Sequence, residues 1–228
     1  MNKILKLSAI ALLASSTSLM AQSKSFEGVS LGITASVIGA EVSGSTSTNT
    51  TSANSSSGSV GKVTEIAAID LSYAFATGSN SLIAIGANYI PGKAKLGSGA
   101  FTDGTNLGSQ NEDSTTSTSA SVKDPYTIYI APTYAISKDA ALYVKVGYSH
   151  ADLSVSSSGT ERVTSSSSKL EGWTYAIGSK TMLTPNTYFG VEASVTDYDN
   201  ISATLTNGKT VSANPKVAQG TISLGYKF

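Results

Sequence analysis

The stretch that decides the fold is GTISLGYKF, Gly220–Phe228. Ile222, Leu224, Tyr226 and Phe228 alternate in it with small or polar residues. Successive side chains of a β-strand point to opposite faces, so this stretch has one apolar face and one polar face. It predicts a strand whose last residue is aromatic, and its meaning depends on whether the rest of the chain repeats the pattern.

Seven earlier segments show the same alternation of large apolar residues with small or polar ones. Their apolar stripes run through Val29–Val37, Ile69–Phe75, Ile83–Tyr89, Tyr126–Ile136, Leu142–Tyr148, Trp173–Ile177 and Phe189–Val195. The turn sequences between them are short: TGSN at 77–80, SKDA at 137–140 and TPNT at 184–187. Each tight turn joins two neighbouring stripes as an antiparallel hairpin.

Long polar segments occupy the alternate connections, at about 43–59, 97–121, 155–168 and 202–214. These segments are too polar to bury themselves, so we expect solvated loops. An even number of strands with alternating long and short connections is typical of outer-membrane barrels. The sequence therefore predicts an all-β fold over residues 22–228: an eight-stranded antiparallel up-and-down transmembrane β-barrel.

Composition agrees with a chain that meets little water. Charged residues make up 13% of it, and 15 Lys and Arg balance 15 Asp and Glu, which gives no basic excess for nucleic acid. Lys3 and Lys6 precede the apolar stretch 9–14, so residues 1–21 are predicted to be a signal peptide. The chain has no Cys, which excludes a lipoprotein anchor, and no later apolar run approaches the ~18 residues of a membrane helix.

The character of the two faces separates a membrane barrel from a soluble one. One face of each predicted strand carries large apolar residues, and the other carries mainly Gly, Ser, Thr and Ala. We expect the apolar face to meet lipid and the small residues to fill the lumen. Aromatic residues near the strand ends are predicted to form interfacial girdles: Tyr73, Phe75, Tyr126, Tyr134, Tyr148, Trp173, Tyr226 and Phe228.

Four charged residues have lumen parity. Asp70, Lys145, Lys180 and Glu192 lie on the polar faces of four strands, three to six residues from a short turn. Two acids and two bases sum to zero, and unpaired charges there would be costly. We expect a salt-bridge network that fills the lumen, because eight strands enclose room for little more than side chains. The alternative is that these residues line a narrow channel. Pro132, in mid-strand, is at odds with regular pairing.

The chain resembles the small outer-membrane β-barrels of the OmpA, OmpX and opacity-protein type. YIAPTYAI (129–136) resembles that family's Gly-Pro-x-Tyr strand end, with Ala131 in place of the Gly. ALYVKVGYSHADL (141–153) and YFGVEASVTDYDNI (188–201) resemble its fifth strand and its strand with an inward Glu. The resemblance implies insertion in the Gram-negative outer membrane and a C-terminal signal for the assembly machinery: Ile222, Leu224, Tyr226 and Phe228.

Three functions stay open at this point. A non-enzymatic envelope or adhesin-like barrel is favoured, and a narrow porin is the alternative. A lipid A-modifying enzyme would depend on His150, Asp152 and Ser154, which share one strand face, but the His-x-Ser motif of lipid A deacylases is not reproduced. We therefore expect no enzymatic activity.

Expected partners follow from the compartment. They are outer-membrane lipid and lipopolysaccharide, the assembly machinery and a weak surface ligand, because the polar segments lack the aromatic and Arg anchors of tight interfaces. No cofactor, metal or nucleic acid is predicted, since His and Cys chemistry is nearly absent from the chain. We expect a monomer.

Overall fold

The computed structural model describes residues 22–47, 57–101, 116–158, 168–204 and 210–228. The predicted signal peptide, 1–21, lies outside the described residues. A short 3-10 helix, η1 (Gln22–Phe26), comes first. Ten strands follow it: β1 (Gly28–Ser47), β2 (Ser57–Ala76), β3 (Ser81–Tyr89), β4 (Lys93–Phe101), β5 (Thr116–Ala135), β6 (Ala140–Ser158), β7 (Ser168–Met182), β8 (Thr187–Tyr198), β9 (Ile201–Thr204) and β10 (Thr210–Lys227).

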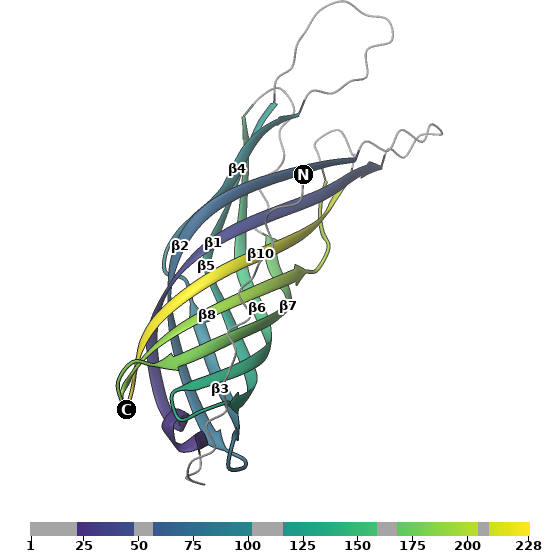
Figure 1. The fold of residues 1–228 in the computed structure, drawn as a ribbon. Helices are drawn as coiled ribbons and strands as arrows, with labels where there is room; N and C mark the ends of the chain where they lie inside the picture. The colour runs from purple at the N-terminus through teal and green to yellow at the C-terminus, as the bar shows by residue number, and fades with distance from the viewer. Residues whose placement is uncertain (1–21, 48–56, 102–115, 159–167, 205–209) are drawn as a thin grey trace, which may run out of the picture.

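The strands form one closed antiparallel barrel (Figure 1). Their order is β1-β2-β3-β5-β6-β7-β8-β10, and β10 pairs again with β1. β4 continues the path of β3 after a break, and β9 follows β8 in the same way, so the wall has eight strands. The prediction of an eight-stranded up-and-down barrel is confirmed.

Closure of the barrel depends on the C-terminal stretch Gly220–Phe228. The β1–β10 ladder runs without interruption from Ser30 opposite Lys227 to Ser47 opposite Thr210. The Phe228 amide donates to the Val29 carbonyl at 2.9 Å, which adds one more bond at the seam. A sheet edge in hydrocarbon would leave N–H and C=O groups unpaired at several kcal/mol each, and this ladder removes both edges.

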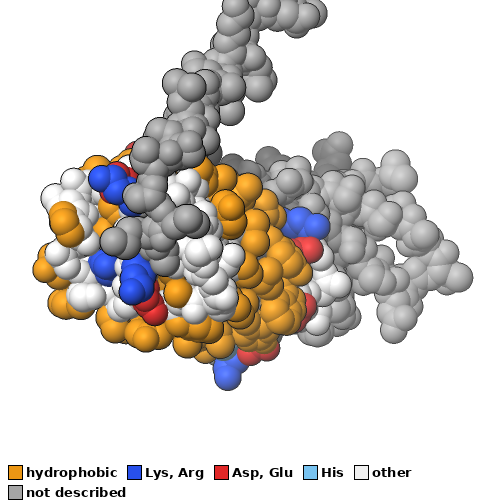
Figure 2. All heavy atoms as spheres, turned by 60° about the horizontal axis from the view of Figure 1, so that its bottom comes forward, with side chains coloured by type: hydrophobic (Ala, Val, Ile, Leu, Met, Phe, Trp, Pro, Cys, Tyr) orange, Lys and Arg blue, Asp and Glu red, His pale blue; other side chains and the backbone are white. Residues whose placement is uncertain are grey.

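The two faces of the wall separate as the alternation predicts. Large apolar side chains point outward and stay exposed, with Ile33 67% and Ile177 63% accessible. Ser, Thr and other small side chains of the opposite parity are buried inside, including Ser36, Thr174 and Thr221. Hydrophobic side chains cover the outer wall as a band, with charged side chains toward its ends (Figure 2). Such a band matches a lipid-facing surface.

One end of the barrel carries the three tight turns, at 77–80, 136–139 and 183–186, and we call it the short-turn end. η1 closes it. The Ser23 amide donates to the Ser79 carbonyl at 3.0 Å, and its hydroxyl donates to the Gly78 carbonyl at 2.9 Å. Phe26 then packs with Leu82, Ala135 and Ala141 inside the wall. This seal was not predicted from the sequence.

At the opposite end of the barrel, which we call the open end, the strands are longer than the sequence predicts. β1, β2 and β5 each contain 20 residues and β6 contains 19. The strands run into all four polar segments that were expected to be loops, and 48–56, 102–115, 159–167 and 205–209 lie outside the described residues. Strand pairing needs only backbone groups, so a polar composition does not prevent it.

Pairing between β2 and β3 stops at Ile69 opposite Tyr89, and β4 pairs with β5 alone. The cause is a kink shared by two strands. Gly92 and Asp124 both have positive φ, at 99° and 48°, and the Asp124 amide donates to the Gly92 carbonyl at 2.9 Å. The β5–β6 register shifts at the same place, between Lys123 and Tyr126. The bulge therefore turns β4 and the first half of β5 away from β2.

Pro132 is accommodated without a change of register. The β5–β6 rungs run to Ile130 opposite Val146 and resume at Thr133 opposite Tyr143. The two skipped positions are 131 and 132, and Pro132 has no N–H to donate. The Pro132 side chain points to the exposed face of β5, with the other lipid-facing residues.

Candidate functional site: the barrel lumen

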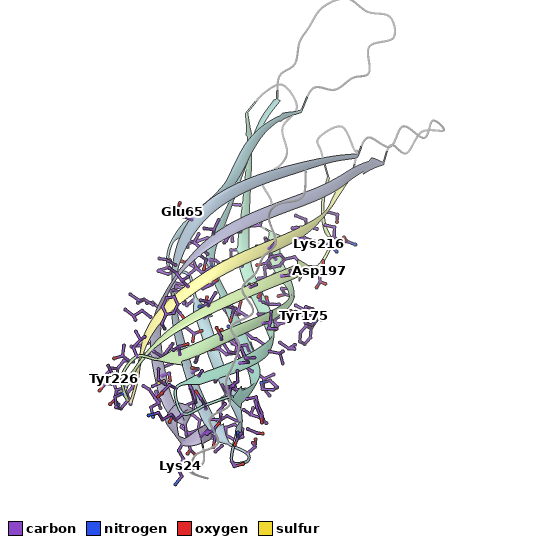
Figure 3. The ribbon with its side chains drawn as sticks, in the orientation of Figure 1. Lys24, Glu65, Tyr175, Asp197, Lys216 and Tyr226 are labelled. Carbon is purple, nitrogen blue, oxygen red and sulfur yellow. The ribbon has the colours of Figure 1, made fainter. Side chains whose placement is uncertain are left out.

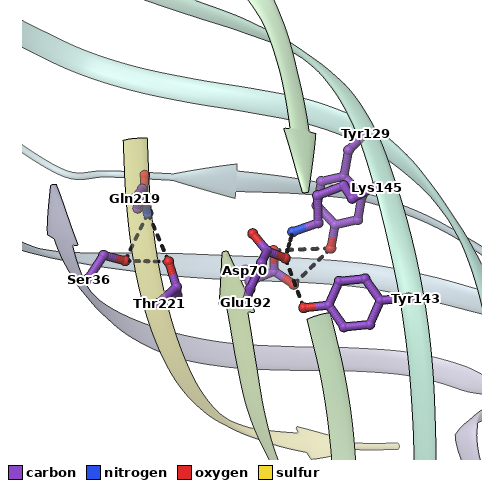
Figure 4. Close-up of polar contacts among 8 residues, drawn as sticks. All are labelled: Ser36, Asp70, Tyr129, Tyr143, Lys145, Glu192, Gln219 and Thr221. Carbon is purple, nitrogen blue, oxygen red and sulfur yellow. Dashed lines mark hydrogen bonds and ion pairs between the residues drawn. The ribbon is translucent and has the colours of Figure 1, made fainter. Parts of the chain in front are cut away.

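The lumen charges come from four strands, as their parity predicts: Asp70 on β2, Lys145 on β6, Lys180 on β7 and Glu192 on β8. Lys145 and Glu192 meet directly, with Nζ 2.5 Å from Oε2 and side chains only 12% and 13% exposed. The Tyr143 hydroxyl donates to the same Glu192 oxygen at 2.8 Å (Figure 4). An ion pair that is largely shielded from water is stabilised by its close geometry and by additional hydrogen bonds, here the one from the Tyr143 hydroxyl.

Asp70 and Lys180 are satisfied in another way. Asp70 accepts from the Tyr129 hydroxyl at 2.9 and 3.1 Å, and Lys145 Nζ lies 4.3 Å from the centroid of the Tyr129 ring. Lys180 Nζ lies 4.7 Å from the centroid of Tyr188, a cation–π distance. Among the described side chains no carboxylate lies within ion-pair distance of Lys180. The structure therefore links the charges through tyrosines and forms no continuous chain of ion pairs.

Three lumen tyrosines, which the sequence reasoning missed, fit onto glycines of the neighbouring strands. Tyr129 lies opposite Gly86, Tyr143 opposite Gly178 and Tyr188 opposite Gly225. A Cβ added at any of these glycines would overlap the tyrosine ring. Because these glycines have no side chain, the tyrosine rings can lie against the wall. The rings fill the lumen there without pushing the strands apart. The available signal was a Gly opposite a Tyr, which is visible only once the register is known.

Hydroxyl side chains form the next layer toward the open end. Ser149 bonds Thr127 at 2.7 Å and Thr174 at 2.5 Å, and Thr174 bonds Thr196 at 2.7 Å. Across the lumen, Gln219 Nε2 donates to Ser36 and Thr221, which also bond one another (Figure 4). The hydroxyls donate and accept among themselves, so this layer is polar and carries no charge.

The layer nearest the open end is apolar. Val122, Ala151, Leu153 and Leu170 form a buried cluster, and Tyr198 and Ile201 pack against it. Val122 points inward because the bulge at Asp124 changes the parity of β5. A cavity of about 160 Å³ lies inside the barrel. Its lining extends from Asp70, Lys145, Lys180 and Glu192, which we call the charged layer, up to Leu170 and Tyr198.

The rim of the barrel holds the residues considered for catalysis. His150 Nδ1 lies 3.3 Å from Glu171 Oε1, and Nε2 lies 3.9 Å from Asp152. Ser154 is four residues further along β6, which at ~3.3 Å per residue is ~13 Å from His150. The three residues follow one strand and do not converge on a point, so they lack the mutual reach of a nucleophile and its base.

The aromatic residues predicted as girdles lie on the outer wall at two levels. Tyr73, Phe75, Tyr134, Tyr226 and Phe228 are near the short-turn end, and Tyr126, Tyr148 and Trp173 lie toward the open end. Tyr148 and Trp173 contact each other edge to face, as do Tyr226 and Phe228. Figure 3 shows Tyr226 at the short-turn end, Tyr175 on the wall, and Asp197 and Lys216 further toward the open end.

Tyr89 and Tyr175 belong to the same outer surface but were not among the predicted girdle residues. Both share the outward parity of their strands and are about half exposed. The parity rule used for the other aromatics is enough to find them.

Neither a cluster of metal ligands nor a membrane-spanning helix is found among the described residues. Within the described ranges no three or more His, Cys, Asp or Glu gather as metal ligands. No helix among them has the length and apolar character needed to cross a membrane.

Comparisons with known proteins point to one family. The model of the outer membrane protein beta-barrel domain matches residues 9–228. No curated protein matches the chain. Outer membrane protein OprG from Pseudomonas aeruginosa is similar in structure, with a TM-score of 0.51 and 10% identity over 89% of this chain and 96% of that one.

Two further solved structures have lower scores. Ail, the attachment invasion locus protein of Yersinia pestis, gives a TM-score of 0.49 and 15% identity over 89% of this chain and 99% of that one. The outer membrane protease OmpT from Escherichia coli gives 0.48 and 11% over 88% and 97%. At such identities the likeness to OprG concerns the fold alone, and the other two scores carry no argument about function.

Proposed function

This chain belongs to the outer membrane protein beta-barrel domain family, and we propose that it acts as a non-enzymatic, non-conducting barrel that displays an extended polar surface outside the cell. The observation that carries the proposal is strand length. A transmembrane strand needs about 9–11 residues, whereas β1, β2 and β5 contain 20 each. About half of each strand therefore stands beyond the bilayer.

The position of the aromatic residues supports the same division. Short turns of outer-membrane barrels face the periplasm, so the open end would face outward. Beyond Tyr126 and Trp173, β1, β2, β5 and β6 continue with Ser- and Thr-rich sequence. A surface of this composition, which is low in charge and poor in aromatic anchors, suits weak contacts with glycans or lipopolysaccharide.

Two layers of side chains support a non-conducting lumen. Phe26 and its apolar neighbours fill the short-turn end, and Lys145, Glu192 and the lumen tyrosines fill the next layer. Ion passage would require both layers to part, including a charge pair that is costly to separate.

A narrow porin remains the second candidate because the lumen holds a cavity of about 160 Å³. The separation of His150 from Ser154 along β6 argues against the lipid A-modifying enzyme. We also propose that residues 1–21 direct export, that Ile222, Leu224, Tyr226 and Phe228 form the assembly signal, and that the protein is a monomer.

Two measurements test the proposal. A heat-modifiability gel on outer membranes should show a boiled and an unboiled band of different mobility, as a folded barrel gives. The purified barrel in a planar bilayer should then give no conductance steps. Regular steps from the unaltered protein would favour the porin.

The surface role needs a separate assay. Gram-negative cells that express the protein should bind glycan-coated or lipopolysaccharide-coated surfaces, and shortening residues 48–56 to an Asn-Gly turn should lower that binding. Pro185→Ala, in a short turn at the other end, is the control and should change nothing. Equal binding by the shortened protein at equal surface abundance would count against the surface role.

A further inference from the structure

From the charged residues toward the open end, the polarity of the lumen decreases. On β7, Lys180 is nearest the short turns, Thr174 follows, and Leu170 is nearest the open end. On β10 the same order gives Thr221, then Gln219 and Val217. Across the strands, six aliphatic side chains line the cavity toward the open end: Ile38, Ile66, Ile90, Val122, Leu170 and Val217. Pro125, Tyr126, Tyr198 and Pro215 line it beside them, with Asn88 and Lys216 as polar neighbours.

This apolar lining is unusual for its position. Lumen-facing side chains of membrane barrels are generally polar because the lumen holds water. Apolar surface facing water is unfavourable by about 25 cal/mol per Å², so a lining of six large side chains favours an apolar occupant over water. If the space above the charged layer held only water, apolar side chains would not be needed there.

The base of the cavity determines what else the occupant must offer. Asp70 and Glu192 balance Lys145 and Lys180, so the layer has no net charge to attract an ion. Above it, Thr174, Ser149 and Thr196 can donate or accept one further hydrogen bond. An uncharged molecule with one polar group matches this base better than an ion does.

The volume limits the size of the occupant. An apolar protein cavity of about 150 Å³ is known to take up benzene, and the cavity here measures about 160 Å³. This volume extends from the charged residues Lys180 and Glu192 up to Leu170, so the cavity has room for at most one ring with a short substituent. Its lining includes Ile66, which lies in the part of β2 that has no rung to β3 or β4, and Ile90, which directly follows β3.

We propose that the outer half of the lumen is a binding site for a small, uncharged, mainly apolar molecule of one ring that carries a single hydroxyl. The ring lies among Ile38, Ile66, Leu170 and Val217, and the hydroxyl points toward Thr174 and its hydrogen-bonded neighbours. This site does not depend on the proposed surface role, because it uses residues inside the wall.

The test is a titration of 4-fluorobenzyl alcohol into the barrel in lipid nanodiscs, followed by fluorine NMR with empty nanodiscs as the blank. The unaltered protein should show a saturable shift. Val217→Phe places a ring in the cavity and should abolish saturation. Val144→Phe makes the same change on the lipid face and should leave binding intact. Ile38→Phe is a second filling variant in case Val217→Phe does not fold.

The hydroxyl contact has its own variant. Thr174→Val keeps the side-chain shape and should weaken binding of the alcohol about fivefold, the worth of one neutral hydrogen bond. Binding of 4-fluorotoluene, which has no hydroxyl, should stay unchanged. Unsaturable uptake by every sample would mean partition into lipid and would overturn the proposal, as would equal binding by a correctly folded filling variant.

Discussion

Tyr129 and Gly86 face each other across one rung of the β3–β5 ladder, and the tyrosine ring occupies the space that a side chain at Gly86 would need. A Cβ there would lie 2.6 Å from Tyr129 Cζ and 2.7 Å from the Leu71 carbonyl oxygen. The ring is thereby held against the wall, where its hydroxyl reaches Asp70. The position of a lumen charge on β2 thus depends on the absence of a side chain on the neighbouring strand, β3.

The first prediction concerns that glycine. Gly86→Val should lower the free energy of unfolding by about 1–3 kcal/mol, the usual cost of overpacking, because neither the ring nor the Leu71 backbone can move aside freely. Gly220→Val is the matched control, since a Cβ at Gly220 meets nothing within 4 Å. Urea unfolding in lipid vesicles measures both. Equal losses for the two variants would show that strand propensity matters and ring placement does not.

The second prediction concerns the pair Lys145–Glu192. Lys145→Leu or Glu192→Leu leaves one charge without its partner in a nearly dry site and should cost about 3–5 kcal/mol. The double variant should cost clearly less than the sum of the two, because no charge is left behind. The exposed pair Lys216–Asp197, at 3.5 Å with side chains 58% and 52% accessible, is the control and should contribute at most about 1 kcal/mol. Additive losses at 145 and 192 would contradict the pairing.

The sequence predicts those features of the site that neighbouring residues of one strand determine. It does not predict features that depend on residues far apart in the chain. The inward direction of Asp70, Lys145, Lys180 and Glu192 follows from the two-residue period of a strand. The period does not tell which of these four side chains contact one another, because contact depends on the register between strands. The period also gives the lipid face of the membrane-spanning part of each strand, so the fold and the outer surface were both predictable.

Other features depend on local geometry that composition conceals. Val122 faces the lumen because a bulge at Asp124, with positive φ, shifts the parity of β5, and no residue pattern announces it. Phe26 precedes the first alternating strand, so its place inside the short-turn end follows only from the fold. The composition of the Ser- and Thr-rich stretches predicts loops, yet outside lipid a strand does not need an apolar face.

The third prediction separates lipid exposure from water exposure. Ile177 is 63% accessible, and on a soluble protein Ile177→Lys would be harmless or favourable. Here it should cost about 2–4 kcal/mol, the value for Lys near the middle of a bilayer. Asp152→Lys, at the rim, should change the unfolding free energy by far less. A neutral result for Ile177→Lys in vesicles would mean that this face does not meet hydrocarbon.

The fourth prediction concerns assembly and uses Phe228, proposed as part of the C-terminal signal. Phe228→Ala removes the edge-to-face contact with Tyr226 but keeps the backbone bond to Val29. The folded, heat-modifiable fraction in cells should fall, whereas refolding of the purified chain into vesicles should reach the same end point. Phe189→Ala, another lipid-facing aromatic, is the control. Equal losses in cells and in vesicles would assign Phe228 a purely structural role.

The last prediction concerns the two layers that close the lumen. Phe26 is 6% exposed among Leu82, Ala135 and Ala141, so Phe26→Ala should destabilise the barrel by about 3–5 kcal/mol. It should still give no conductance, because the layer of Lys145, Glu192 and the lumen tyrosines remains. Tyr129→Ala alone should likewise stay silent, since Phe26 still fills the short-turn end. Only a variant that combines Phe26→Ala with Tyr129→Ala, Lys145→Ala and Glu192→Ala, and so removes the charge pair as well as both rings, should produce steps in a planar bilayer, measured on protein whose gel mobility proves it folded. Conductance from either single variant would show that one layer alone seals the lumen.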